Sequence, residues 1–371
     1  MTKHIHSTDI PRDEGCYFRP SFKLQIPFSK MRGMNTRPSE AFAPGPISNP
    51  AATRPQDTLL ANFHLPLRDT FYPLGYPVDI LTNSADVLLA AFETFGHANK
   101  SRPGPSLEIR FGVSKGTSSA CPPEPTRREF NHLYSLVADG ENQALLDLQR
   151  CLSFTWVTEQ TVKNRIYFRY NFLEKVVYLL LGSSVVTDLH AACVSKRGRG
   201  ILLCGNSGAG KSTLAYACAR AGWTYTSDDT SYLINDSHPP RVIGHAHRAR
   251  FRPAARSLFP ELAGFEMGPR MEGKPSLEVP TSMLPIASTA SEVEVAFIVY
   301  LNRTSPGLGR LIKLPEGAGS TRLSAELYSA GEIRELHEQR LQTLQSVPTF
   351  ELQYQSTDEA MEILDLLLSS S

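Results

Sequence analysis

The sequence predicts an α/β fold in which a mixed sheet surrounds a glycine-rich loop and a smaller α+β domain comes first. Two observations lead to the expectation of a mixed sheet around the loop. Residues 201–204 form an apolar run that is followed by glycines and then by helix formers, as at a strand–loop–helix junction. Residues 189–195 form a second strand pattern, and the tight turn 196–200 connects it to the first. Since such a hairpin differs from the isolated strand of a doubly wound parallel sheet, we expect strands of both directions.

Length and composition exclude several classes of protein. The chain has 371 residues, enough for about one to three domains. The net charge is +1 and both signs are interspersed, so neither nucleic acid nor an anionic membrane is expected as a partner. No apolar run approaches the ~20 residues that span a bilayer. The N-terminus has no hydrophobic signal region, so we expect a cytoplasmic protein.

Composition and pattern divide the chain into three parts. Residues 1–57 are rich in proline and poor in periodicity, which indicates an extended or disordered leader. Residues 58–184 are interpreted as an α+β N-terminal domain without a chemical motif, which either recognises a substrate or only supports its neighbour. Residues 185–371 are interpreted as the domain that contains the glycine-rich loop and a set of C-terminal helices.

Within the N-terminal domain, Asn83 and Ser84 precede a helix expected at 87–95. Alternation of apolar and polar residues predicts a strand at 107–113. The Ser-, Pro- and Gly-rich segment 114–128 is expected to be a surface loop. Further elements are expected in the order strand 152–157, strand 166–170 and helix 171–181.

The second domain continues with short strands and ends with helices. Residues 294–301 are the most apolar segment and are expected to form a central strand. A Ser/Thr-Asp-Glu start at Ser356 predicts the last helix, which has an apolar face. The remaining elements are expected as strands at 231–234, 241–243, 277–279 and 349–354, and as helices at 320–328 and 332–344.

The glycine-rich loop matches a motif with a defined chemistry. Gly205, Gly210, Lys211 and Ser212 fit G-x-x-x-x-G-K-[ST], the Walker A motif or P-loop. Glycines let successive backbone N–H groups point at phosphate oxygens, and the following helix adds its partial positive charge. Lys211 would reach the β- and γ-phosphates, and Ser212 would ligate Mg²⁺. We therefore expect ATP and Mg²⁺ as cofactors, bound by Gly205, Asn206, Ser207, Gly208, Ala209, Gly210, Lys211, Ser212 and Thr213.

Two adjacent aspartates follow this loop at the end of an expected strand. Asp228 and Asp229 lie close enough in sequence to complete the metal site or to accept a proton from a substrate. A basic stretch, residues 248–256, comes later in the chain. One of its arginines is a candidate for a phosphate contact, and a solvated face is the alternative.

Taken together, these residues resemble the C-terminal catalytic domain of the HPr kinase/phosphorylase family. The resemblance rests on His190 in the hairpin strand, GNSGAGKST at 205–213, and the glycine–aromatic lead into the aspartate pair at 222–229. It covers about residues 185–235 and extends more weakly to about 303. That family shares a fold with phosphoenolpyruvate carboxykinase, so the resemblance implies a P-loop set in a mixed sheet.

The resemblance also implies roles for individual residues. Lys211 would hold the β- and γ-phosphates, and His190 would orient the aspartate pair. One of Asp228 and Asp229 would act as general base while the other ligates metal. Glu278 would match the family's later metal-binding glutamate, although the surrounding Leu-Glu-Ile-Arg-Gly signature is absent. HPr kinases usually have Glu where this chain has Thr213, so HPr as substrate and phosphorolysis both stay open.

The sequence therefore predicts an ATP- and Mg²⁺-dependent kinase that transfers the γ-phosphoryl group to a hydroxyl, on a protein serine or on a small molecule. The alternative is an ATP-binding or ATP-hydrolysing module that regulates a partner without phosphotransfer. The sequence leaves open whether the chain forms a homo-oligomer, as HPr kinases do.

Overall fold

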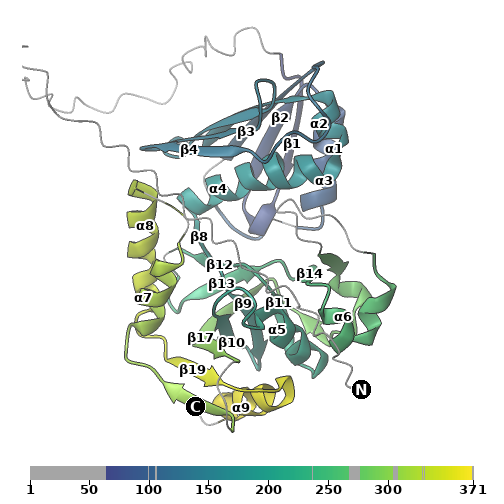
Figure 1. Cartoon of the computed structure of the whole chain (residues 1–371). Coiled ribbons are helices and arrows are strands. Elements are labelled where there is room, and N and C mark those ends of the chain that lie inside the picture. The colour runs from purple at the N-terminus through teal and green to yellow at the C-terminus, as the bar shows by residue number, and fades with distance from the viewer. Residues whose placement is uncertain are drawn as a thin grey trace, which may run out of the picture. The chain divides into compact units, whose positions relative to one another are not determined.

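The computed structural model describes residues 64–98, 100–104, 107–235, 237–266, 276–303, 308–327, 329 and 331–369. They lie within one compact unit that runs from Asp57 to Ser371. The expected leader, 1–57, lies outside the described residues. The described residues form a seven-stranded sheet, a ten-stranded sheet and a two-stranded sheet (Figure 1). Both large sheets contain parallel and antiparallel pairs, as the predicted mixed α/β architecture requires.

The seven-stranded sheet has the order β1-β2-β3-β7-β6-β5-β4. β2, β3 and β7 run parallel to one another, and the other neighbours are antiparallel. Its strands are β1 Leu67–Phe71, β2 Val78–Thr82, β3 Leu107–Ser114, β4 Thr126–Phe130, β5 Leu133–Val137, β6 Gln143–Asp147 and β7 Leu152–Thr158. The expected boundary near residue 184 falls between this sheet and the next one, but the division into domains stays a prediction.

Helices cover one face of this sheet (Figure 1). They are η1 Pro73–Gly75, α1 Ala85–Phe95, α2 Glu159–Lys163, α3 Arg165–Phe168, the π-helical turn η2 Arg169–Leu173, and α4 Glu174–Ser184. Phe168, Phe172, Val176 and Leu180 recur every four residues and are fully buried against the sheet. This spacing explains why the run from α3 to α4 is one nearly continuous helical segment.

One prediction for this region was wrong, and a second was wrong only at the ends of its segment. Residues 166–170 are helical rather than a strand, because Asn164 caps α3 by accepting from the Tyr167 N–H, at 3.2 Å, and the four-residue spacing continues into α4. The segment 114–128, expected to be only a loop, already enters β4 at Thr126. All five residues of β4 are exposed, so the strand has no apolar alternation to reveal it.

The ten-stranded sheet is organised around β17, the strand expected to be central. β17 pairs with β10 on one side, and with β13 and then β19 on the other. β9 and β10 form the predicted hairpin. The strands are β8 Val186–Leu189, β9 Ala192–Lys196, β10 Arg199–Cys204, β11 Thr224–Ser227, β12 Ser231–Ile234, β13 Arg241–Gly244, β16 Ser288–Thr289, β17 Glu292–Asn302, β18 Arg310–Lys313 and β19 Thr349–Gln353.

Helices lie on both faces of this second sheet. Ile201 and Leu203 of β10 pack with the face that α5 and α9 cover, whereas Leu202 and Cys204 pack with residues of α7 and α8. The helices are α5 Lys211–Arg220, α7 Ala318–Ala325, α8 Gly331–Leu341, η5 Gln342–Leu344 and α9 Thr357–Ser369. None of the helices described is long and apolar enough to cross a membrane.

A two-stranded sheet packs against α5. β14 Arg248–Phe251 pairs with β15 Leu277–Pro280, and the short turns α6 Ala255–Leu258, η3 Pro260–Gly264 and η4 Thr281–Met283 flank it. Phe251 contacts Tyr216 of α5 edge to face, with ring centroids 4.9 Å apart. This contact places β14 beside the helix that follows the glycine-rich loop.

A largely buried ionic group connects the helices beside the seven-stranded sheet to the two-stranded sheet. We define the arginine–glutamate cluster as Arg169, Glu174, Arg248, Arg250 and Glu278. Glu174 accepts from Arg169 Nε at 2.9 Å and from both terminal nitrogens of Arg248 at 3.1 Å. Glu278 accepts from Arg169 Nη2 at 2.7 Å and from Arg250 Nε at 2.9 Å. The cluster therefore joins η2 and α4, beside the first sheet, to β14 and β15.

Removing one charge from this cluster should destabilise the protein strongly. Glu174→Gln leaves three guanidinium groups with a single carboxylate, that of Glu278, and breaking a buried ion pair costs about 3 to 5 kcal/mol. Glu338→Gln is the control, because its Arg334 partner lies on the surface of α8, where a pair is worth about 0 to 1 kcal/mol. Urea unfolding of both variants measures the difference. Equal, small losses would show that the cluster does not hold α4 to the two-stranded sheet.

Candidate functional site

The glycine-rich loop adopts a backbone that only glycine accommodates well. After β10 ends at Cys204, Gly205, Gly208 and Gly210 have φ values of 136°, 88° and 100°. A Cβ on Gly210 would lie 2.8 Å from the Tyr354 hydroxyl oxygen, which donates to Ala209 O at 3.0 Å. The strand–loop–helix order expected from the motif is thus present, and the end of β19 anchors the loop.

Lys211, the first residue of α5, folds back over this loop. Its Nζ donates to Gly205 O at 2.6 Å and lies 3.0 Å from His190 Nε2. Burial lowers the pKa of the lysine, and the charge of Asp229 opposes that effect. Lys211 is only 6% exposed, so its ammonium is held at the loop rather than in solvent.

His190 links Lys211 to the aspartate pair. It was expected within a hairpin strand, but it occupies the corner between β8 and β9. Its Nδ1 lies 3.7 Å from Asp229 Oδ1, on the side of the ring opposite Lys211. Burial and the neighbouring Lys211 both lower the pKa of His190, so the neutral ring is favoured. An ammonium beside Nε2 then requires the proton on Nδ1, which faces Asp229.

The two aspartates lie where β11 ends, and α5 connects to them directly. Ser212 Oγ donates to the backbone oxygen of Asp228 at 3.0 Å. Asp228 itself is buried, and each of its carboxylate oxygens accepts a hydrogen bond: Oδ1 from the Tyr225 hydroxyl at 2.9 Å and Oδ2 from the Arg250 N–H at 3.0 Å. Burial and the charge of Asp229 raise the pKa of Asp228 to about 6.

Asp229 has a different environment. Its side chain is 39% exposed and lies beside His190. Together with Asp228 it lines a small cavity of about 80 Å³. A proton acceptor must be accessible to its substrate, and the side chain of Asp229 is more exposed than that of Asp228.

Glu278 lies in the arginine–glutamate cluster. Burial alone would raise its pKa, but Arg248, Arg250 and Arg169 hold the pKa well below its ordinary value. Its contact with the aspartate pair is indirect, because Arg250 bonds Glu278 through Nε and Asp228 through its backbone N–H. Metal binding by Glu278 stays a prediction. Within the described ranges, no three His, Cys, Asp or Glu side chains group as a metal site.

Sequence patterns missed two parts of this site. Glu174, which comes from the region without a motif, fixes the arginines beside Asp228. Glu326, at the end of α7, has a pKa raised by burial, and its Oε2 accepts no hydrogen bond from the described residues. Its charge acts on Lys211. No local pattern could have revealed either residue, because both reach the site from distant elements.

The raised pKa of Asp228 makes a prediction about stability. Between its unfolded pKa near 3.8 and its folded pKa of about 6, the folded state binds more protons, so stability falls as the pH rises through this window. Two pKa units correspond to about 3 kcal/mol. Asp228→Asn should lack this loss. The free energy of unfolding of the variant minus that of the wild type should therefore grow between pH 4 and 7 in urea titrations. A constant difference would contradict it.

Comparisons with known proteins add little to this geometry. No family model matches the chain, and no curated protein matches it. Among solved structures, the chain is similar to the Hpr(Ser) kinase/phosphatase from Coxiella burnetii, with 11% identity and a TM-score of 0.30. The match covers 50% of this chain and 92% of the other. The likeness is a distant one in fold.

Proposed function

We propose that this protein is an ATP- and Mg²⁺-dependent kinase that transfers the γ-phosphoryl group to a hydroxyl. One observation carries the proposal: His190 lies within 3.0 Å of Lys211 Nζ and 3.7 Å of Asp229 at the mouth of the glycine-rich loop. A phosphate-binding lysine and a candidate base are thus joined through one ring. Phosphoryl transfer requires this combination of charge neutralisation and positioning.

The residues at the loop fit a nucleoside triphosphate with magnesium. The loop from Gly205 to Gly210 has the left-handed glycines that turn backbone N–H groups toward an anion, and α5 begins directly after it. The Ser212 hydroxyl and the carboxylate of Asp228 are oxygen ligands, which Mg²⁺ prefers. Bound there, the ion would neutralise charge that develops on the phosphates.

The contrast between the aspartates supports distinct roles. Asp228 is held by Tyr225 and Arg250, so it suits a fixed metal ligand and a brace for the strand end. Asp229 is more exposed and faces the histidine, so it suits the general base that accepts the proton of the attacking hydroxyl. His190 Nδ1 lies 3.7 Å from Asp229 Oδ1, so the ring would position Asp229 by its proximity. ATP hydrolysis without an acceptor is the alternative function.

Lys211→Ala should remove ATP binding and phosphoryl transfer almost completely. The variant loses the cation that meets the β- and γ-phosphates, and removal of one such group lowers kcat by roughly 100- to 1000-fold. Thermal shift with ATP–Mg²⁺ measures nucleotide binding. Transfer of labelled γ-phosphate to a host extract measures the rate of phosphoryl transfer. Lys196→Ala is the control, because Lys196 pairs with Asp365 away from the loop. Normal binding and transfer by Lys211→Ala would refute the proposal.

Asp229→Asn should separate chemistry from nucleotide binding. The amide cannot accept the hydroxyl proton, and loss of a general base costs roughly 100- to 10,000-fold in rate. The ATP-dependent thermal shift should be unchanged, whereas label transfer should fall by that factor. If transfer persists at the wild-type rate, Asp229 is not the base. Label released only as free phosphate by the wild type would favour the ATPase alternative.

A further inference from the structure

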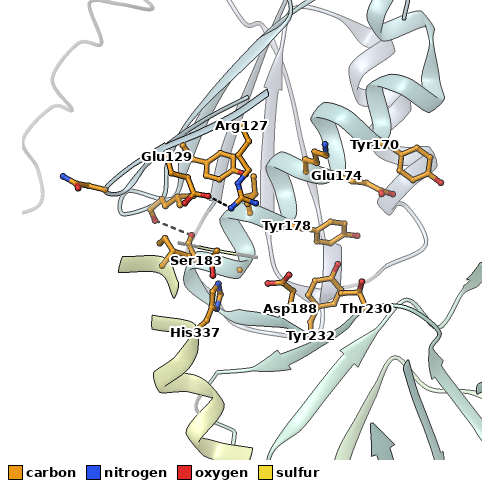
Figure 2. Close-up of a pocket in the computed structure, with 18 residues that line it drawn as sticks. Arg127, Glu129, Tyr170, Glu174, Tyr178, Ser183, Asp188, Thr230, Tyr232 and His337 are labelled. Atoms are coloured by element: carbon orange, nitrogen blue, oxygen red, sulfur yellow. Dashed lines mark hydrogen bonds and ion pairs between the residues drawn. The ribbon is translucent and has the colours of Figure 1, made fainter. Parts of the chain in front are cut away.

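A cavity of about 320 Å³ lies between the elements of the two large sheets. We name it the tyrosine cavity, after Tyr134, Tyr170, Tyr178 and Tyr232 in its walls. Figure 2 shows Tyr178, Asp188 and Tyr232 close together, with Arg127 and Glu129 across from them and His337 below. Its walls come from β4, β5, α4, β8, β12 and α8, so residues from both sheets enclose it.

Shared walls connect this cavity to the proposed catalytic residues. Tyr178, Thr230 and Tyr232 also line the smaller cavity of about 80 Å³ that contains Asp228 and Asp229. Asp188 and Thr230 also line a cavity of about 50 Å³ that contains His190. Thr230 directly follows Asp229 in the chain. Thr230 thus lines all three cavities and is the chain neighbour of the candidate base.

The walls offer two kinds of contact. The rings of Tyr178 and Tyr232 stack with centroids 5.4 Å apart and provide aromatic surface. Asp188 and His337 provide polar groups at one end. His337 Nδ1 is bonded to the Thr187 hydroxyl at 2.9 Å, and no described residue bonds its Nε2. Such a mixture of aromatic walls and a few polar groups is typical of sites for small molecules, whose volumes begin near 300 Å³.

We propose that the phosphoryl acceptor is a small hydroxyl compound bound in the tyrosine cavity, not a serine on a folded protein. The compound has a planar or apolar part that packs on Tyr178 and Tyr232, and polar groups that meet Asp188 and His337. This inference rests on the proposed kinase function. A cavity of about 320 Å³ matches a molecule of amino-acid or nucleoside size, and its aromatic and polar lining is typical of a small-molecule site.

The reaction would join the two sites. The acceptor oxygen forms a bond to the γ-phosphorus of ATP, and the bond from that phosphorus to the β–γ bridging oxygen breaks. Asp229 takes the hydroxyl proton, and the electron pair of the broken bond stays on ADP. The products are a phosphate monoester and ADP.

A substitution at Gly182 can fill the tyrosine cavity without altering the glycine-rich loop or the aspartate pair. It is buried in α4 and lines the cavity, and a Cβ there would meet no atom within 4 Å. Replacement of a helical glycine also favours the helix by up to about 1 kcal/mol. Its carbonyl, which accepts from Arg340 Nη1 at 2.8 Å, is unchanged by substitution. Gly182→Leu therefore places a side chain in the cavity, and Gly182→Ala is the matched control.

The experiment compares these variants with labelled ATP and two fractions of a host extract, one of low molecular mass and one of protein. We expect wild type and Gly182→Ala to label the low-mass fraction. Gly182→Leu should do so at least about tenfold more slowly, with the same ATP-dependent thermal shift as wild type.

Other outcomes overturn the inference in distinguishable ways. Lys211-dependent label on protein, transferred equally fast by Gly182→Leu, would refute the small acceptor and leave the kinase in place. Equal labelling of the low-mass fraction by both Gly182 variants would refute the cavity as its site. No transfer to either fraction would refute the proposed kinase and this inference with it.

Discussion

The buried pairing of arginines and glutamates is the interaction on which the rest of the site depends. Glu174, from α4, fixes Arg248 of β14 and lies 3.9 Å from Arg250, whose backbone N–H in turn bonds the carboxylate of Asp228. Buried charges are stable only when their partners stay in place. A region without any chemical motif thus determines the position of an aspartate that the motif-bearing region supplies.

Two aspartates that are neighbours in sequence differ in burial, and this difference suits them to different roles. Asp228 is enclosed and each of its oxygens accepts a hydrogen bond, whereas Asp229 keeps part of its surface and faces His190. A carboxylate with a raised pKa destabilises the folded state at neutral pH. The cluster beside it offsets that cost, because the charge of Arg250 lowers the pKa of Asp228. Stability and site geometry are therefore coupled through one residue, Arg250, by its guanidinium charge and its backbone N–H.

The tyrosine cavity also depends on the elements beside the first sheet. Tyr178 comes from α4 and Tyr232 from β12, and their stacked rings form a wall that neither sheet forms alone. Arg340 of α8 strengthens the same junction by donating to Gly182 O and Ser184 O at the end of α4. From the sequence, the N-terminal region could either recognise a substrate or only support its neighbour. In the structure, it contributes residues to the cavity that shares its walls with the cavity of Asp229.

The sequence by itself determined what depends on neighbours in the chain. The glycines of the loop, the hairpin of β9 and β10, and the apolar run of β17 follow from backbone sterics and periodicity, which are local. Only the tertiary structure decided that residues 166–170 are helical, that Glu278 pairs with arginines, and that the two aspartates differ. The physical reason is that burial and ion pairing depend on distances in space. Arg169 and Glu278 meet there although no sequence spacing relates them.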